Sequence, residues 1–171
     1  TLGLMAQIAQ PSVQSLLVEM QVNGTPLSTG TAFVVQAGSG PYLLTNRHNV
    51  TGRRQDTGAP LSPTGGIPTH LVVVHNRKGN LGQWVLKSEP LYAGAAPRWR
   101  EHPSLGAAAD FVALPLTDLV DVDLFPYDAG NPGPNIFVGP ADAVSVIGFP
   151  FGVAAGGAFG VWATGFLASE P

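Results

Sequence analysis

The sequence predicts an all-β protein. The chain has 22 glycines and 16 prolines among 171 residues, which interrupt it too often for long helices. Hydrophobic residues make up 44% of the chain, enough for a packed core, and they occur in short runs separated by turn signals. A helical pattern appears only weakly, just after His48. Short strands and many turns are typical of antiparallel barrels and sandwiches.

Six short apolar runs precede residue 120, and turn or loop residues separate them. They are SLLVEMQV at 15–22, GTAFVVQ at 30–36, YLLT at 42–45, LVVVH at 71–75, QWVLKS at 83–88 and FVALPL at 111–116. Asn23-Gly24 and the glycine-rich stretch 38–41 are hairpin signals, and Pro115 favours an edge or terminal position for the last run. We expect a six-stranded antiparallel β-barrel over residues 13–120, with residues 51–69 as a surface loop.

The remainder of the chain predicts a linker and an incomplete second barrel. Residues 121–142 are loop-like and contain Pro126, Pro132, Pro134 and Pro140, which is typical of an interdomain connection. Two further strands are expected within 143–171, at 144–148 and 161–168. Two strands cannot close a barrel alone, so residues 143–171 should be the first strands of a truncated second barrel.

Residues 143–168 carry no charge and are long enough to cross a bilayer as a helix. Their six glycines and Pro150 instead favour two buried strands joined by a glycine-rich loop. We therefore expect a soluble protein without a membrane partner. The N-terminus lacks the basic flank of a signal peptide, and nothing in the sequence indicates a compartment.

Composition excludes several classes of function. Eight scattered Lys and Arg residues and a net charge of −3 argue against nucleic-acid binding. The absence of cysteine excludes disulfides, a cysteine nucleophile and cysteine-ligated metals. The four histidines show no metal-binding spacing, so neither a metal nor a cofactor is expected. His75 lies in an apolar run and is expected to be structural or at a strand end, whereas His70 and His102, beside polar loop residues, are expected to face solvent.

His48 and Asp110 are the candidate catalytic residues. His48 comes just after the run 42–45, where a side chain is held by a strand yet open to substrate, as a general base requires. Position alone favours a plain loop histidine that caps the following turn. Asp110 precedes the run 111–116, and a partly buried carboxylate there needs a partner. That partner is an arginine, backbone N–H groups or the ring N–H of His48.

Four segments in this order resemble the bacterial trypsin-like (chymotrypsin-fold) serine peptidases. They are GTAFVV at 30–35, LLTNRH at 43–48, ADFVAL at 109–114 and VIGFPFG at 146–152. The resemblance implies two six-stranded barrels with a Ser-His-Asp triad in the cleft between them. It makes His48 the general base and Asp110 the residue that orients it. The separation, 110 − 48 = 62 residues, is longer than in many members, and the loop 51–69 could absorb the excess.

The chain departs from this family in one respect. The family's nucleophile lies in a Gly-x-Ser-Gly motif, and no serine after Asp110, neither Ser145 nor Ser169, has that context. We expect a fragment of a serine endopeptidase that acts on polypeptides, inactive without the Ser and self-associating through bare strand edges. The alternative is a non-catalytic trypsin-like β-barrel that serves as a protein-interaction module.

Overall fold

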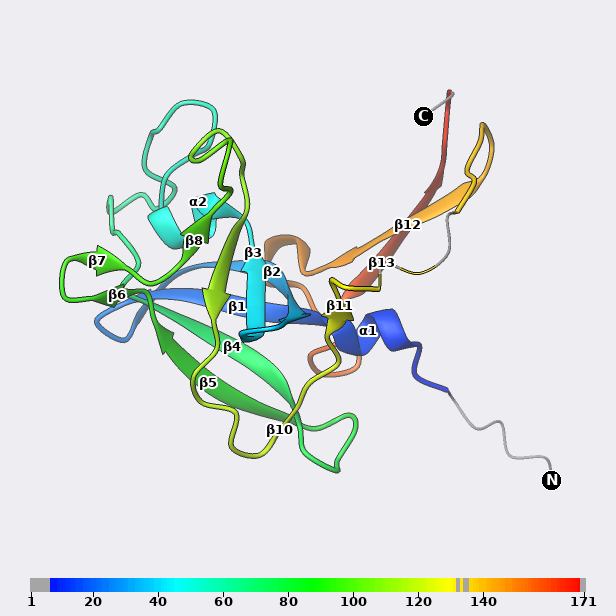
Figure 1. Cartoon of the computed structure of the whole chain (residues 1–171), viewed down its shortest axis with the longest axis horizontal. Helices are drawn as coiled ribbons and strands as arrows, with labels where there is room; N and C mark the ends of the chain where they lie inside the picture. Colours follow the sequence, from blue (N-terminus) through cyan, green and yellow to red (C-terminus); the bar gives the residue numbers. More distant parts are fainter. Residues whose placement is uncertain (1–6, 132, 134–135, 170–171) are drawn as a thin grey trace.

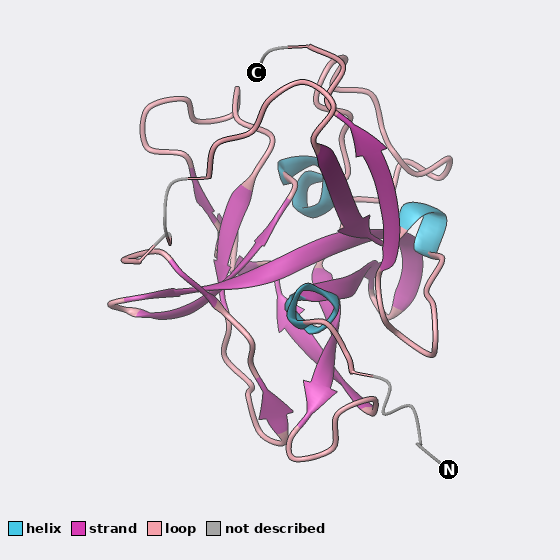
Figure 2. Ribbon diagram, turned by 90° about the vertical axis from the view of Figure 1, so that its right-hand side faces the viewer, coloured by secondary structure: helices cyan, strands magenta, loops and turns pink. Residues whose placement is uncertain are grey.

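A computed structural model describes residues 7–131, 133 and 136–169. Strands account for 46% of the chain and helices for 8%, so the predicted all-β class is confirmed. Figures 1 and 2 show strands throughout the fold and helices of one or two turns only.

All eight predicted strands are present, with shifted ends and some short additions. Nine strands form one sheet: β1 (Ser15–Val22), β2 (Thr25–Ala37), β3 (Gly40–Thr45), β4 (His70–Arg77), β5 (Trp84–Pro90), β8 (Arg100–Glu101), β9 (Val112–Pro115), β10 (Val122–Asp123) and β11 (Tyr127–Asp128). Two separate pairs are β6 (Tyr92–Ala93) with β7 (Ala96–Pro97), and β12 (Ala143–Gly148) with β13 (Val161–Phe166). The helices are α1 (Gln10–Gln14), α2 (Arg47–Thr51) and the 3-10 turn η1 (Pro150–Gly152).

The main sheet runs in the order β10-β4-β1-β2-β3-β9-β8, with β5 paired to β4 and β11 parallel to β2. The expected closed barrel is not found. Among the described residues, no backbone ladder joins β5 to β9, so the sheet stays open along this seam. Two strands pair only where the register and twist of the whole sheet bring their backbones together. The sequence of either strand alone does not determine this, so barrel closure could not be predicted from the apolar runs.

Side chains bridge the seam between β5 and the segment after β9. Glu89, on β5, is fully buried and accepts hydrogen bonds from the backbone N and the Oγ1 of Thr117, both at 2.7 Å. Lys87 Nζ lies 3.0 Å from Asp118 Oδ1, and this bond holds the pKa of the Asp118 carboxyl below its usual value. The Arg98 guanidinium lies 3.5 Å from Glu89 Oε2 and balances the buried charge. Side-chain bonds, and not a backbone ladder, thus connect β5 to the segment after β9.

The core lies on one face of this curled sheet. Alternate residues of β1 are buried, namely Leu16, Val18 and Met20, as the period of a strand requires. They pack in one cluster with Ala32, Val34, Leu43, Val50, Leu71, Val73, Leu91, Val112, Leu114 and Leu116. Each such side chain contributes about 1.5–3 kcal/mol by leaving water, so this cluster accounts for most of the fold's stability.

The predicted burial of the last two strands is wrong. β12 and β13 form an antiparallel hairpin, but Val146 remains 73% exposed and Phe166 72% exposed. Figure 1 shows this hairpin projecting beyond the main sheet. A strand is buried only when another layer covers it, and the run of apolar residues could not reveal whether such a layer exists. None of the helices in the described part of the chain is long and apolar enough to span a membrane.

The expected linker, 121–142, is less loop-like than predicted, because β10 pairs with β4 and β11 pairs with β2. This segment therefore lies along the main sheet for part of its length. Pro132 and Pro134 of the linker, and residues 170–171 of the expected second barrel, lie outside the described residues. The three domain boundaries themselves stay predictions.

His75, on β4, is a polar side chain inside the core. It is 1% exposed, and neither ring nitrogen has a hydrogen-bond partner among the described residues. Burial lowers the pKa of His75 from 6.5 to about 4, with Glu89 and Asp118 opposing the shift and Lys87 adding to it. Its deep burial without a hydrogen-bond partner among the described residues supports the structural role expected for this histidine.

We predict that His75 makes stability fall with acidification. Its pKa is lowered by folding, so its contribution is complete above pH 6.5 and is lost as the pH falls from 6.5 toward about 4. Between about pH 7.5 and about pH 4.5, urea unfolding should show a loss for the wild type that exceeds the loss for His75→Leu by about 2 to 3 kcal/mol. Both proteins contain the same carboxylates, so an identical loss in the two would contradict this assignment.

Candidate functional site

The register of β3 against β9 brings the two predicted site residues together. Thr45, the last residue of β3, pairs with Val112, the first residue of β9. Because the two strands are antiparallel, the residues that follow β3 and those that precede β9 lie at the same end of the ladder. His48 and Asp110 occupy these two places, although 62 residues separate them in the sequence.

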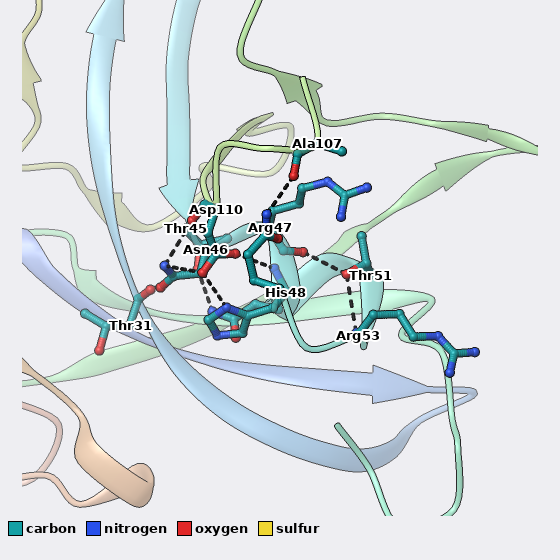
Figure 3. Close-up of polar contacts among 11 residues, drawn as sticks. Thr31, Thr45, Asn46, Arg47, His48, Thr51, Arg53, Ala107 and Asp110 are labelled. Atoms are coloured by element: carbon teal, nitrogen blue, oxygen red, sulfur yellow. Dashed lines mark hydrogen bonds and ion pairs between the residues drawn. The ribbon is translucent and has the colours of Figure 1, made fainter. Parts of the chain in front are cut away.

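The imidazole of His48 and the carboxylate of Asp110 point toward each other (Figure 3). Nδ1 of His48 lies 2.7 Å from Oδ2 of Asp110, and the backbone N of His48 donates to Oδ1 at 3.0 Å. The two side chains are 32% and 30% exposed, so the pair is half-buried and accessible from solvent. With Nδ1 directed at the carboxylate, Nε2 is the ring nitrogen left for proton transfer.

Asn46 is a third member of the site that sequence reasoning did not single out. Its amide Nδ2 donates to the backbone O of Asp110 at 3.0 Å and to the carboxylate Oδ2 at 3.2 Å. Figure 3 shows the Asn46 amide beside Asp110 and the His48 ring. The available signal was its place, directly after the apolar run that ends at Thr45 and two residues before His48.

Two further contacts join the His48 segment to the segment that leads into Asp110. Arg47 Nε lies 2.9 Å from Glu101 Oε1, and Gln55 Nε2 donates to the backbone O of Ala107 at 2.6 Å. Both are at the surface, where an ion pair contributes about 0–1 kcal/mol. These two contacts restrain the loop that carries Asp110 but contribute little to the free energy of unfolding.

The short helix α2 is seated on β2 by small and polar residues. Gly30 approaches Asn49 so closely that a Cβ at that position would lie 2.6 Å from Asn49 Nδ2. Asn49 is 3% exposed and donates to Thr45 Oγ1, which in turn donates to the backbone O of Thr31. The helix ends at Gly52, whose left-handed conformation lets its N–H bond to the backbone O of His48. His48 thus stands on a firmly held turn.

Two cavities flank the pair. One, of about 240 Å³, is lined by His48 with Arg54, Gln55, Asp56 and Leu61. The other, of about 510 Å³, lies against Asn46 and Phe111, the two neighbours of Asp110, and is otherwise lined by Thr31, Phe33, Leu44, Thr45 and Ile147. The cavity at His48 is lined mainly by polar and charged residues, whereas most residues around the other are apolar.

Ser39 and Ser145 lie in other surroundings than His48. Ser39 Oγ is 2.9 Å from the hydroxyl of Tyr42 in the β2–β3 hairpin, and Ser145 Oγ is 2.8 Å from Thr164 Oγ1 on the β12–β13 hairpin. Neither residue lines the cavity at His48. The described residues contain no group of three or more His, Asp or Glu side chains that could hold a metal ion.

The remaining histidines have local roles. His102 Nδ1 accepts hydrogen bonds from the backbone N of Ser104 and of Leu105, and His70 Nδ1 lies 3.1 Å from Thr69 Oγ1. Both are partly buried instead of solvent-facing as the sequence predicted, because each is held against its own turn. His48 is the histidine whose ring meets a carboxylate.

Comparison with known proteins adds no family assignment. No family model, no curated protein and no solved structure matches the chain. The resemblance to trypsin-like peptidases therefore stays a prediction from the four sequence segments.

The hydrogen bond between His48 and Asp110 is testable in the chain itself. We predict a protected ring proton on His48 Nδ1 in a ¹H–¹⁵N spectrum, and its loss in Asp110→Asn. The carboxylate accepts from both the backbone N and Nδ1 of His48, whereas an amide offers one acceptor oxygen and a donor that turns the ring to the other tautomer. Asp56→Asn, beside the same histidine but exposed, should leave the signal in place. A signal that survives Asp110→Asn would mean that the two side chains do not meet in solution.

Proposed function

We propose that His48 and Asp110 belong to the active site of a trypsin-like serine endopeptidase that hydrolyses peptide bonds. The observation that carries the proposal is the 2.7 Å contact between His48 Nδ1 and Asp110 Oδ2, at the ends of two strands paired in register. A half-exposed imidazole oriented by a carboxylate is the arrangement that activates a serine hydroxyl.

In the proposed reaction His48 moves protons and Asp110 orients it. Nε2 takes the proton of the serine hydroxyl as the oxygen bonds to the substrate carbonyl carbon, and the tetrahedral intermediate then expels the amine, which receives that proton from Nε2. Water repeats the sequence on the acyl-enzyme and releases the carboxylic acid. Asp110 remains ionised and balances the imidazolium charge. The chemistry requires no metal or organic cofactor.

The strand arrangement supports the finer fold assignment. The main strands β1, β2, β3, β4, β5 and β9 would become a six-stranded antiparallel barrel if β5 paired with the end of β9 that β8 leaves free. Glu89 and Lys87 of β5 already reach Thr117 and Asp118, just after β9, through side chains. We propose that this unit is the first barrel of the family and that the β12–β13 hairpin begins the second.

The proposed nucleophile is a serine outside the printed residues. The resemblance places it on a loop of the second barrel, beside the backbone N–H groups of an oxyanion hole. The 171-residue chain is therefore proposed to be inactive, although it contains two of the three triad residues. The second candidate is a non-catalytic interaction module of the same fold, which needs no nucleophile and fits the placement of Ser39 and Ser145 away from His48 equally well.

A serine-reactive fluorophosphonate probe tests this proposal. The 171-residue chain should not be labelled, because the probe requires an activated serine. If the reading frame continues past position 171 into a Gly-x-Ser-Gly motif, the longer protein should be labelled, and labelling should fall at least about 10³-fold in its His48→Ala variant. Labelling of the 171-residue chain at one of its own serines would contradict the placement of the nucleophile, and a stop codon directly after position 171 would favour the interaction module.

We also propose that the 171-residue chain associates with a second copy through the β12–β13 hairpin. A two-stranded hairpin is marginally stable by itself in water, and both outer edges of this one have no strand partner among the described residues. Residues 143–168 carry no charge, so two copies can bring these edges together without electrostatic repulsion.

Sedimentation analysis at rising protein concentration should show dimers or larger species of the wild-type chain. Val146→Lys, which places a charge on the exposed hairpin, should shift the protein toward the monomer. Leu81→Lys introduces the same charge at an exposed apolar residue of a turn outside the hairpin and serves as the control. A monomer at all concentrations would remove the idea of self-association.

A further inference from the structure

The carboxylate of Asp110 depends on few groups for its orientation. Within the described residues, its side-chain oxygens accept hydrogen bonds from His48, through the backbone N and Nδ1, and from the amide of Asn46. No Lys or Arg in the described part of the chain forms an ion pair with it. Apart from the histidine that it is proposed to orient, the carboxylate therefore has one side-chain donor.

The amide of Asn46 restrains Asp110 at two points. Its Nδ2 bonds to the backbone O of Asp110 at 3.0 Å and to Oδ2 at 3.2 Å, so one group links the main chain and the carboxylate of the same residue. Both partners are acceptors, which assigns the NH₂ side of the amide to Asp110. Oδ2 is the oxygen that also meets His48 Nδ1 at 2.7 Å.

The position of Asn46 at the start of α2 gives an independent reason to regard this contact as specific. Asn46 is the N-cap residue of α2, a place where an asparagine side chain usually accepts a hydrogen bond from the first turn of the helix. Here the side chain makes no capping bond. Its amide bonds to Asp110 instead, so the side chain does not cap the helix.

We propose that Asn46 is a positioning residue that holds Oδ2 of Asp110 against Nδ1 of His48. Without this amide, the carboxylate keeps a single backbone donor on Oδ1 and is freer to rotate about its Cβ–Cγ bond. The bond to His48 then opens more often, and the imidazole is less well fixed for proton transfer. The inference rests on the proposed function, because it concerns the geometry of the same proposed dyad.

The test measures exchange of the His48 Nδ1 proton with water in the 171-residue chain, which requires no nucleophile. Asn46→Ala should leave the fold intact and speed this exchange about fivefold, the factor expected for loss of one ordinary hydrogen bond. Asn46→Asp keeps the shape but places a second carboxylate beside Oδ2, and it should speed the exchange further or remove the signal. Asn80→Ala, which removes an exposed asparagine amide from a surface turn, is the matched control and should change nothing.

The outcomes separate this inference from the function on which it rests. Faster exchange in both Asn46 variants, with Asn80→Ala unchanged, supports the positioning role. Exchange within about twofold of the wild type in Asn46→Ala and Asn46→Asp, while Asp110→Asn abolishes the signal, overturns the role of Asn46 and leaves the dyad in place. Persistence of the signal in Asp110→Asn overturns the dyad and the inference together. Circular dichroism shows whether Asn46→Ala folds. If it does not fold, the exchange rate in the isosteric Asn46→Asp variant decides whether Asn46 positions Asp110.

Discussion

The pairing of β3 with β9 is the constraint on which the rest of the site depends. It places the residues after β3 and the residue before β9 at one end of a single ladder, and no local feature of either segment could bring them together. The buried face of these strands, with Leu43 and Leu114 fully buried, keeps the register from slipping, because a shift of one residue would turn those side chains to solvent. The hydrophobic core thereby sets the distance between His48 and Asp110.

The surroundings of the pair divide into a rigid side and an open side. Behind His48, Asn49 and Thr45 link α2 to β2 through buried hydrogen bonds, and Gly30 permits the close approach. In front, the side chains of His48 and Asp110 retain about a third of their exposure. A site built in this way can keep its geometry while a reactant enters, which is the requirement that separates a reactive histidine from one that merely fills space.

Local patterns predicted the strands, and they predicted that His48 and Asp110 were candidates for one site, because alternation, turn residues and motif order are all encoded in short segments. The open seam between β5 and β9 could not be predicted, since it depends on how the curled sheet meets itself. The exposure of Val146 and Phe166 was missed for a similar reason: a run of apolar residues indicates a face to be covered but not the layer that covers it. Asn46 was overlooked because its hydrogen-bond partner, Asp110, lies 64 positions away in the sequence.

The side-chain bridges across the seam from β5 have a consequence for how the fold moves. A backbone ladder opens cooperatively, whereas separate bonds such as those of Glu89 to Thr117 and of Lys87 to Asp118 break one at a time. Brief separations of this edge should therefore be more frequent than openings of the long ladders among β1, β2, β3 and β4, and they would admit water to the interior beside Glu89.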